Sequence, residues 1–258
     1  MSSRPRSTPM SLWRLEVLRM TRSPRGLVLG GVYVFFGLLG PVMAKYMDKL
    51  ADHVTGTVKI VVPAPTPPDG MVNYIGQTSQ TGMIVVVVIA AGALALDARR
   101  GLSVFYRTRT TSLATLIVPR YIVTTLTAVL AYVLGTLGCW YGSELLLGTL
   151  PVGGVLAGIL CGVVQLAFSV AVVALAASIT RGVLGAIGVT LSMLLLLPLL
   201  GTIGAIHDWL PSTLIAAPAE LLSDHTLGDY LPALAVGLTA TPLLLLLAIR
   251  GLQRREVG

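Results

Sequence analysis

Charged residues are scarce in this chain. Asp, Glu, Lys and Arg make up 11% of its 258 residues and 55% are hydrophobic, whereas about a quarter of the residues of an ordinary soluble domain are charged. Long apolar stretches recur to the end of the chain, which argues against a secretory signal followed by a soluble domain. The composition therefore indicates an integral membrane protein. Its net charge of +7 is better explained by membrane topology than by binding to nucleic acid.

Lysine is rarer still, and its distribution bears on nucleotide binding. The P-loop pattern GxxxxGK[ST] needs a lysine behind a glycine-rich loop, but the only lysines are Lys45, Lys49 and Lys59, which all follow the first apolar stretch. We therefore expect that this chain is not an enzyme by itself and cannot hydrolyse ATP through that motif.

Cysteine and histidine are too few and too scattered to indicate a metal site. Cys139 and Cys161 lie near or within apolar stretches and have no adjacent His or Cys, so we interpret them as small apolar membrane residues, with a disulfide between them as the alternative. Gly142-Ser143-Glu144 and His207-Asp208 offer the residue types of a serine hydrolase. We place both in outer loops, without the strand–turn–helix context that such a serine needs.

Six apolar stretches are long enough to cross a bilayer as helices, which takes roughly 20 residues. None contains Asp, Glu, Lys, Arg or His, and this disfavours an ion-coupled secondary carrier. Gln165 is the most polar residue of the central stretches, and we expect it to bond to a neighbouring helix. The fold class is all-α, one membrane domain over residues 1–258. The predicted spans are Leu27–Ala44, Ile75–Leu96, Tyr121–Gly138, Val152–Ser178, Val183–Ala205 and Leu231–Ile249.

Arginine and lysine fall on opposite sides of these spans. All 15 arginines lie before the first span, in the second-to-third or fourth-to-fifth connection, or after the sixth, while the three lysines lie on the other side. Because basic connections stay in the cytoplasm, we expect a multi-pass protein of the cytoplasmic membrane with both termini inside.

Residues 1–26 contain a separate short helix in this interpretation. Thr8 is suited to cap it and Pro9 to begin it, and Ser23-Pro24 end it. Apolar residues at helical spacing indicate a helix along the inner leaflet, and a disordered basic tail is the alternative. The residues assigned to the membrane interface are Trp13, Val17, Met20, Arg19 and Arg22.

The two large outer connections differ in character. Four prolines within residues 63–68 favour an extended, stiff segment before the second span, and we place the polar residues 77–80 at the membrane interface. In the outer loop 206–230, the apolar piece Leu214–Leu222 is too short to cross, so we expect a re-entrant or interfacial segment.

Small residues recur at helical spacing in several spans, where they let helices approach closely. Gly26 and Gly30 form one such pair. Gly154, Gly158 and Gly162 form a longer series, which we assign to helix packing within the chain or against a second subunit. Pro41, Pro198 and Pro242 would bend their spans.

The segment 97–120 concentrates arginine between the second and third spans. An arginine at a helix centre costs about 2.5–3.5 kcal/mol on insertion scales, so the four arginines of residues 99–109 would cost on the order of 10 kcal/mol. The segment therefore cannot span and must lie on the cytoplasmic face.

This layout resembles the ABC-2 family of ABC-transporter permeases. Members have a cytoplasmic interfacial helix, six spans, a coupling helix between spans two and three, and a re-entrant outer segment before span six. Their local signature is an acid at the end of span two and a glycine four residues on, which Asp97 and Gly101 match. Arg120 is similar to the basic residue that opens their third span. Members more often show Glu, then Gly-Thr, where this chain has Asp97, and Gly101-Leu102 followed by Ser103.

The resemblance implies the membrane subunit of an ATP-driven exporter. Such a subunit pairs with a second copy or a related permease, and separate ATPase subunits hold the ATP and Mg²⁺, so this chain needs no cofactor. A short helix in the segment would dock into the ATPase, with two aromatic anchors and arginines that pair with acids or lipid phosphates. The residues assigned to docking are Asp97, Arg99, Arg100, Gly101, Ser103, Phe105, Tyr106, Arg107 and Arg109.

Other interpretations remain open at this stage. In one alternative, the segment 97–120 is a basic loop whose only role is to fix the membrane topology. The whole chain also suits a non-catalytic subunit or scaffold of another complex, and a secondary carrier ranks third.

Overall fold

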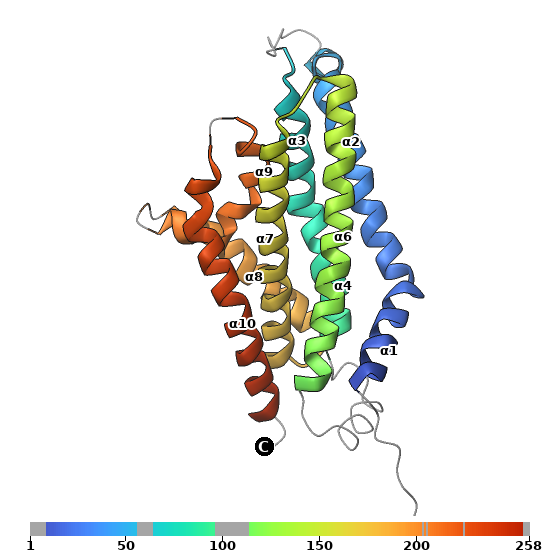
Figure 1. Cartoon of the computed structure of the whole chain (residues 1–258), viewed down its shortest axis with the longest axis vertical. Coiled ribbons are helices and arrows are strands. Elements are labelled where there is room, and N and C mark those ends of the chain that lie inside the picture. Colours follow the sequence, from blue (N-terminus) through green and yellow to red (C-terminus); the bar gives the residue numbers. More distant parts are fainter. Residues whose placement is uncertain are drawn as a thin grey trace, which may run out of the picture.

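The computed structural model describes residues 9–55, 64–95, 114–202, 204, 206–223 and 225–254. Over these ranges the regular elements are all helices, without a strand, and six helical segments are long and apolar enough to cross a membrane. The chain is thus a multi-pass membrane protein, and the six predicted spans and the all-α class are confirmed (Figure 1).

The six spans alternate in direction along one bundle (Figure 1). Most are longer than predicted, and the first and last spans continue into flanking polar residues, whereas the fifth, predicted to reach Ala205, ends at Leu200. The second span combines α3, a π-helical turn and α4 without a break. The spanning elements are α2 (Pro24–Thr55), α3 (Pro67–Gln77), the turn η1 (Thr78–Gly82), α4 (Met83–Leu94), α6 (Ala114–Leu146), α7 (Val152–Ile179), α8 (Val183–Leu200) and α10 (Leu231–Arg254).

The start of the second span differs from the prediction. Residues 77–80 lie in the middle of the span Pro67–Leu94 rather than at its edge. The extended proline-rich segment is also shorter than predicted, because Pro67 and Pro68 begin a helix instead. Proline suits a first helical turn, where its missing N–H needs no partner. The N–H of Thr66 donates to the Asp69 carboxylate at 2.6 Å, which fixes this start.

Helix α7 forms the centre of the bundle. It contacts α4, α6, α8 and α10, and most of its side chains are buried, many of them Ala, Ser or Gly. Small side chains allow these neighbours to approach on several sides at once. By contrast, α8 carries leucines such as Leu184 and Leu195 that are largely exposed in the single chain, as expected for a helix that faces lipid or another subunit.

The glycines assigned to helix packing face inward, within the chain. A Cβ added to Gly154 would lie 2.7 Å from the Leu221 carbonyl oxygen, and one added to Gly158 would lie 2.7 Å from Cα of Pro218. At Gly162 the space is taken by the Tyr132 ring. Gly30 differs, since a Cβ there would meet nothing within 4 Å.

The segment before the last span folds back into the bundle. It consists of η3 (His207–Trp209), η4 (Pro211–Ile215), α9 (Ala217–Glu220) and η5 (Leu227–Tyr230). Leu214 and Ala217 are fully buried. Gly158, which meets Pro218, lies six residues inside α7, or roughly 9 Å below its start at 1.5 Å per residue. The apolar piece therefore dips among the helices as a re-entrant segment does.

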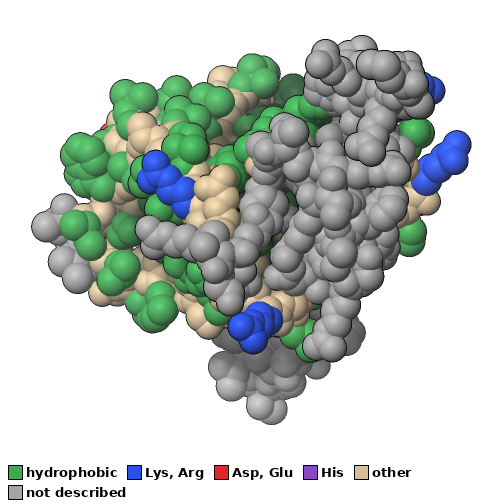
Figure 2. Space-filling model, turned by 90° about the horizontal axis from the view of Figure 1, so that it is seen from below, with side chains coloured by type: hydrophobic (Ala, Val, Ile, Leu, Met, Phe, Trp, Pro, Cys, Tyr) green, Lys and Arg blue, Asp and Glu red, His purple; other side chains and the backbone are tan. Residues whose placement is uncertain are grey.

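Helix α1 (Pro9–Thr21) packs beside the start of α6 and the start of α2, and Thr8, the residue predicted to cap it, lies outside the described residues. This end of the molecule also holds the ends of α4, α7 and α10, and with them the described arginines (Figure 1). We call it the arginine end. Figure 2 looks onto it and shows basic side chains among hydrophobic ones. The acids Asp69, Glu144, Glu220 and Asp229 belong to elements at the opposite end (Figure 1).

Candidate functional site

The predicted docking segment lies outside the described residues. Asp97, Gly101 and the other residues assigned to it fall in the gap between Ala95 and Ala114. Both sides of this gap nevertheless lie at the arginine end of the bundle, because the description stops at Ala95 after α4 and starts again at Ala114 with α6. The site can therefore be built from the groups that surround these two positions.

A buried ion pair joins α1 to the start of α6. Nε of Arg120 donates to Oε1 of Glu16 at 2.9 Å, and Arg120 is only 7% exposed. Arg19, one helical turn after Glu16, adds a second, looser contact at 3.7 Å. Glu16 is the one acid that the structure places at the arginine end among the described residues, and two arginines share it.

The residues assigned to the membrane interface divide between two sides of α1. Met20 is buried, at 8% exposure, against the bundle. Trp13 and Val17 are exposed, with 37% and 46% of their surfaces accessible, and Arg19 and Arg22 are exposed as well. One side of the helix thus holds it to the protein, while apolar side chains remain accessible on another.

A polar cleft of about 290 Å³ lies beside the ion pair, between α1, α2, α4 and α6. Its charged lining is three arginines and one glutamate, Arg19, Arg25, Arg120 and Glu16, with Ser23 and Thr124 as uncharged polar groups. The guanidinium of Arg25 passes over Gly92 of α4, where an added Cβ would lie 3.7 Å from Nη2. We call this feature the basic cleft.

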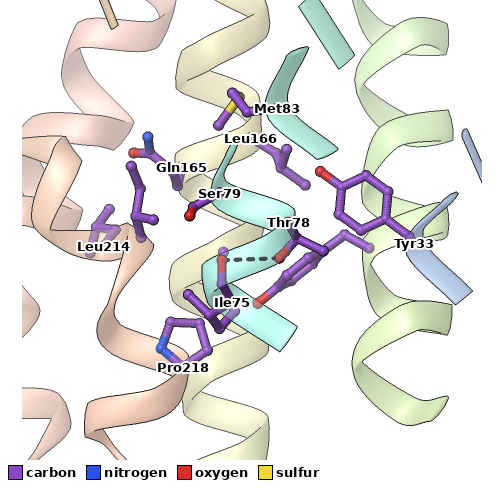
Figure 3. A pocket seen from close by; sticks show the side chains of 12 residues that line it. Tyr33, Ile75, Thr78, Ser79, Met83, Gln165, Leu166, Leu214 and Pro218 are labelled. Atoms are coloured by element: carbon purple, nitrogen blue, oxygen red, sulfur yellow. Dashed lines mark hydrogen bonds between the residues drawn. The ribbon is translucent and has the colours of Figure 1, made fainter. Parts of the chain in front are cut away.

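A second, smaller cavity of about 40 Å³ lies in the middle of the bundle (Figure 3). The π-helical turn supplies two of its hydroxyl-bearing residues, Thr78 and Ser79, and α7 supplies Gln165. The turn arises because the N–H of Met83 reaches back to the carbonyl of Thr78. A π-turn accommodates one residue more than an α-turn and is frequent at functional sites.

Gln165 does not make the interhelical bond predicted for it. Its side chain is 4% exposed, and Oε1 has no hydrogen-bond partner among the described residues. A buried unpaired amide oxygen costs about 1–3 kcal/mol, so a water molecule or a ligand group in this cavity would stabilise it. A water molecule needs about 10–15 Å³ of such a cavity, so the 40 Å³ of this one holds only a few waters.

Three tyrosines pack together beside this cavity, where α2, α3 and α6 approach one another at a glycine of α6. Tyr33 and Tyr132 meet edge to face at 6.2 Å, and the Tyr74 hydroxyl donates to the Tyr132 carbonyl oxygen at 3.3 Å. Gly135 makes this possible, because a Cβ there would lie 2.7 Å from the Tyr74 hydroxyl oxygen and 2.6 Å from the Tyr33 carbonyl oxygen. The three helices therefore pack as one unit.

The hydrolase candidates are not brought together as a site. Gly142-Ser143-Glu144 belongs to helix α6 and not to an outer loop, so its predicted location was wrong. Ser143 is fully buried, whereas the bonded pair His207 and Asp208 is exposed. Cys139 and Cys161 are separate free thiols in the interior.

Sequence reasoning missed Glu16 and Arg25 as members of the site. One signal was available for Glu16: it is the single acid among the six arginines of residues 1–26. No sequence signal indicated that Arg25 would lie over Gly92, because this contact depends on how α2 packs against α4.

The comparisons with known proteins found no match, whether with protein-family models, curated proteins or solved structures.

Proposed function

We propose that this chain is the membrane-spanning permease subunit of an ATP-driven ABC exporter of the ABC-2 type. The observation that carries the proposal is the Glu16–Arg120 ion pair, which fastens α1 to α6 just after the segment assigned to docking. The order of elements supports it: a short helix, six spans, an arginine-rich connection after the second span and a re-entrant segment before the last.

In this proposal a motor subunit acts on the chain through residues 97–113. In the sequence that segment follows α4 and precedes α6. The ion pair passes the movement of α6 to α1, and the glycine contacts of Gly37 and Gly135 pass it to α2. ATP binding by the motor then shifts α1, α2 and α6 together relative to the rest of the bundle.

The partners follow from what the chain lacks. Two ATPase subunits would supply ATP and Mg²⁺, and the chain would need no cofactor of its own. The central cavity has room for a few waters only, so we place the cargo path between two permease copies. The arginine end would face the cytoplasm, in accord with the positive-inside rule. The exported molecule stays unidentified.

Co-purification with an ATPase tests the proposal. The full chain is tagged and expressed together with a candidate P-loop ATPase subunit, and bound ATPase is quantified in detergent. We expect the double variant Phe105→Ala, Arg107→Glu to lose the ATPase. The matched control Phe35→Ala, Arg250→Glu changes an exposed aromatic and an exposed arginine of the described chain and should retain it.

Two results would contradict the proposal: an ATPase that never accompanies the chain, or one that still accompanies the docking variant at the control level. Either outcome would favour a membrane subunit or scaffold of a different complex.

A further inference from the structure

We propose that the basic cleft binds the phosphate of an anionic lipid headgroup. The inference concerns the pocket between α1, α2, α4 and α6 and does not depend on the exporter function. It rests on three observations: the charge of the lining, the size of the cleft and the apolar surface beside it.

The charge of the cleft calls for an anion. Three guanidinium groups face one carboxylate, so the described lining carries a net charge of +2. Glu16 is already engaged by Arg120 at 2.9 Å and by Arg19 at 3.7 Å. Arg25 has no carboxylate partner among the described residues, and it is held over Gly92 at the wall of the cleft. Guanidinium groups bind phosphate oxygens in pairs, with both charge and geometry matched.

The size of the cleft exceeds what hydration of the ion pair needs. At about 10–15 Å³ per water by the same measure, 290 Å³ corresponds to on the order of 20 water-sized groups. A phosphate with the glycerol carbons attached to it fits this space. The hydroxyls of Ser23 and Thr124 line it as further polar groups.

The surroundings favour a lipid as the source of the phosphate. The apolar part of the lining consists of Met20, Pro24, Ala93 and Val123. Directly after the cleft, Leu27 and Val28 of α2 are 78% and 51% exposed, as expected where acyl chains contact the protein. The cleft thus stands at the boundary between the arginine end and the apolar belt, the depth at which headgroup phosphates lie.

The test measures thermal unfolding of the purified full chain in a zwitterionic detergent. Cys139 and Cys161 are fully buried, so a thiol-reactive dye reports unfolding. Soluble short-chain phosphatidylglycerol, short-chain phosphatidylcholine and inorganic phosphate are titrated separately. We expect phosphatidylglycerol to raise the unfolding temperature saturably, and the other two to produce no shift beyond a chloride control of equal ionic strength.

Variants locate the effect. Arg25→Gln should weaken the apparent affinity for phosphatidylglycerol at least tenfold, with Arg25→Lys in between. Arg14→Gln is the matched control, since Arg14 is an exposed arginine of α1 that does not line the cleft, and it should bind as the parent does. The unfolding temperature without lipid shows whether each variant is folded.

Three results would overturn the inference. Equal stabilisation by phosphatidylcholine would mean that charge is not recognised, and equal losses in Arg25→Gln and Arg14→Gln would place the site elsewhere. A shift with inorganic phosphate as large as that with the lipid would assign the cleft to a free anion. None of these results bears on ATPase docking, so the two proposals fail separately.

Discussion

Arg120 illustrates how one charge is accommodated at the edge of an apolar bundle. It is 7% exposed, in a helix whose remaining described part is almost without charge. A buried charge is tolerated when it is paired and hydrogen-bonded, and Glu16 supplies the pairing from a helix more than a hundred positions earlier. The same carboxylate limits the positive charge of the basic cleft without cancelling it.

Replacing Glu16 by Gln should therefore destabilise the chain. The change removes the charge of the carboxylate that Arg120 contacts at 2.9 Å, at a cost of about 1–3 kcal/mol, which the thiol-reactive dye would record as a fall in unfolding temperature. Glu144→Gln is the control, because Glu144 is an exposed acid that accepts a bond from Trp140 on the same helix, and it should change the temperature little.

A double-mutant cycle separates the pair from the general effect of each change. If Glu16 and Arg120 stabilise the chain through their mutual contact, the double variant Glu16→Gln, Arg120→Gln should lose less stability than the sum of the losses in the two single variants. Strict additivity of the two single changes would mean that the 2.9 Å contact contributes nothing to stability.

At the scale of elements, close contacts between small residues and backbone decide the packing. The re-entrant segment rests against α7 only because Gly154 and Gly158 leave room for the backbone of residues 218 and 221. Without a hydrophobic driving force between helices in lipid, such packing is a main source of association. The π-turn of the second span acts in a different way, by directing Thr78 and Ser79 toward the central cavity.

Gly158→Ala should loosen the re-entrant segment. The new methyl group would stand 2.7 Å from Cα of Pro218, and overpacking of this kind costs about 1–3 kcal/mol. Gly153→Ala on the same helix is the matched control, because a Cβ there meets nothing within 4 Å, and alanine favours a helix by up to about 1 kcal/mol over glycine.

Unfolding temperatures of the two glycine variants provide the comparison. We expect a fall of several degrees for Gly158→Ala and no fall for Gly153→Ala. Equal changes in unfolding temperature for the two variants would show that α9 does not pack against α7 at Gly158.

For the whole molecule, the separation of charge along the bundle axis is the dominant feature. Described arginines lie at one end of the bundle, and most of the described acids, among them Asp69, Glu144 and Asp229, lie at the other. Basic segments are retained on the cytoplasmic side during insertion, so this separation and the six alternating spans point to one orientation. The docking proposal depends on that orientation, because an ATPase acts from the cytoplasm.

Labelling of introduced cysteines tests the orientation. Thr149→Cys lies in the exposed connection between α6 and α7, and Ser103→Cys lies in the segment assigned to docking. With a membrane-impermeant maleimide, we expect the first to react in intact cells and the second only after permeabilisation. The parent chain is the control, since its two cysteines are buried. The reverse pattern would remove the basis for docking.

Much of the fold could be read from the order of residues. Six apolar stretches and the re-entrant piece before the last span depend on local composition and on the need to satisfy every backbone group in lipid, and the structure has both. The boundaries were less accurate, because polar residues such as those of 77–80 continue a helix through the span, although only Thr78 among these four is buried.

The sequence by itself predicted six spans and the separation of arginine from lysine in the connections between them, since hydropathy and charge act at each position separately, and the structure has six helices able to cross a membrane. Only the tertiary structure decided that Glu16 meets Arg120, that Arg25 lies over Gly92, and that the side-chain oxygen of Gln165 beside the central cavity has no partner among the described residues. Each of these depends on the rotation and depth of one helix against another, which side-chain volumes fix in three dimensions and which no local pattern encodes.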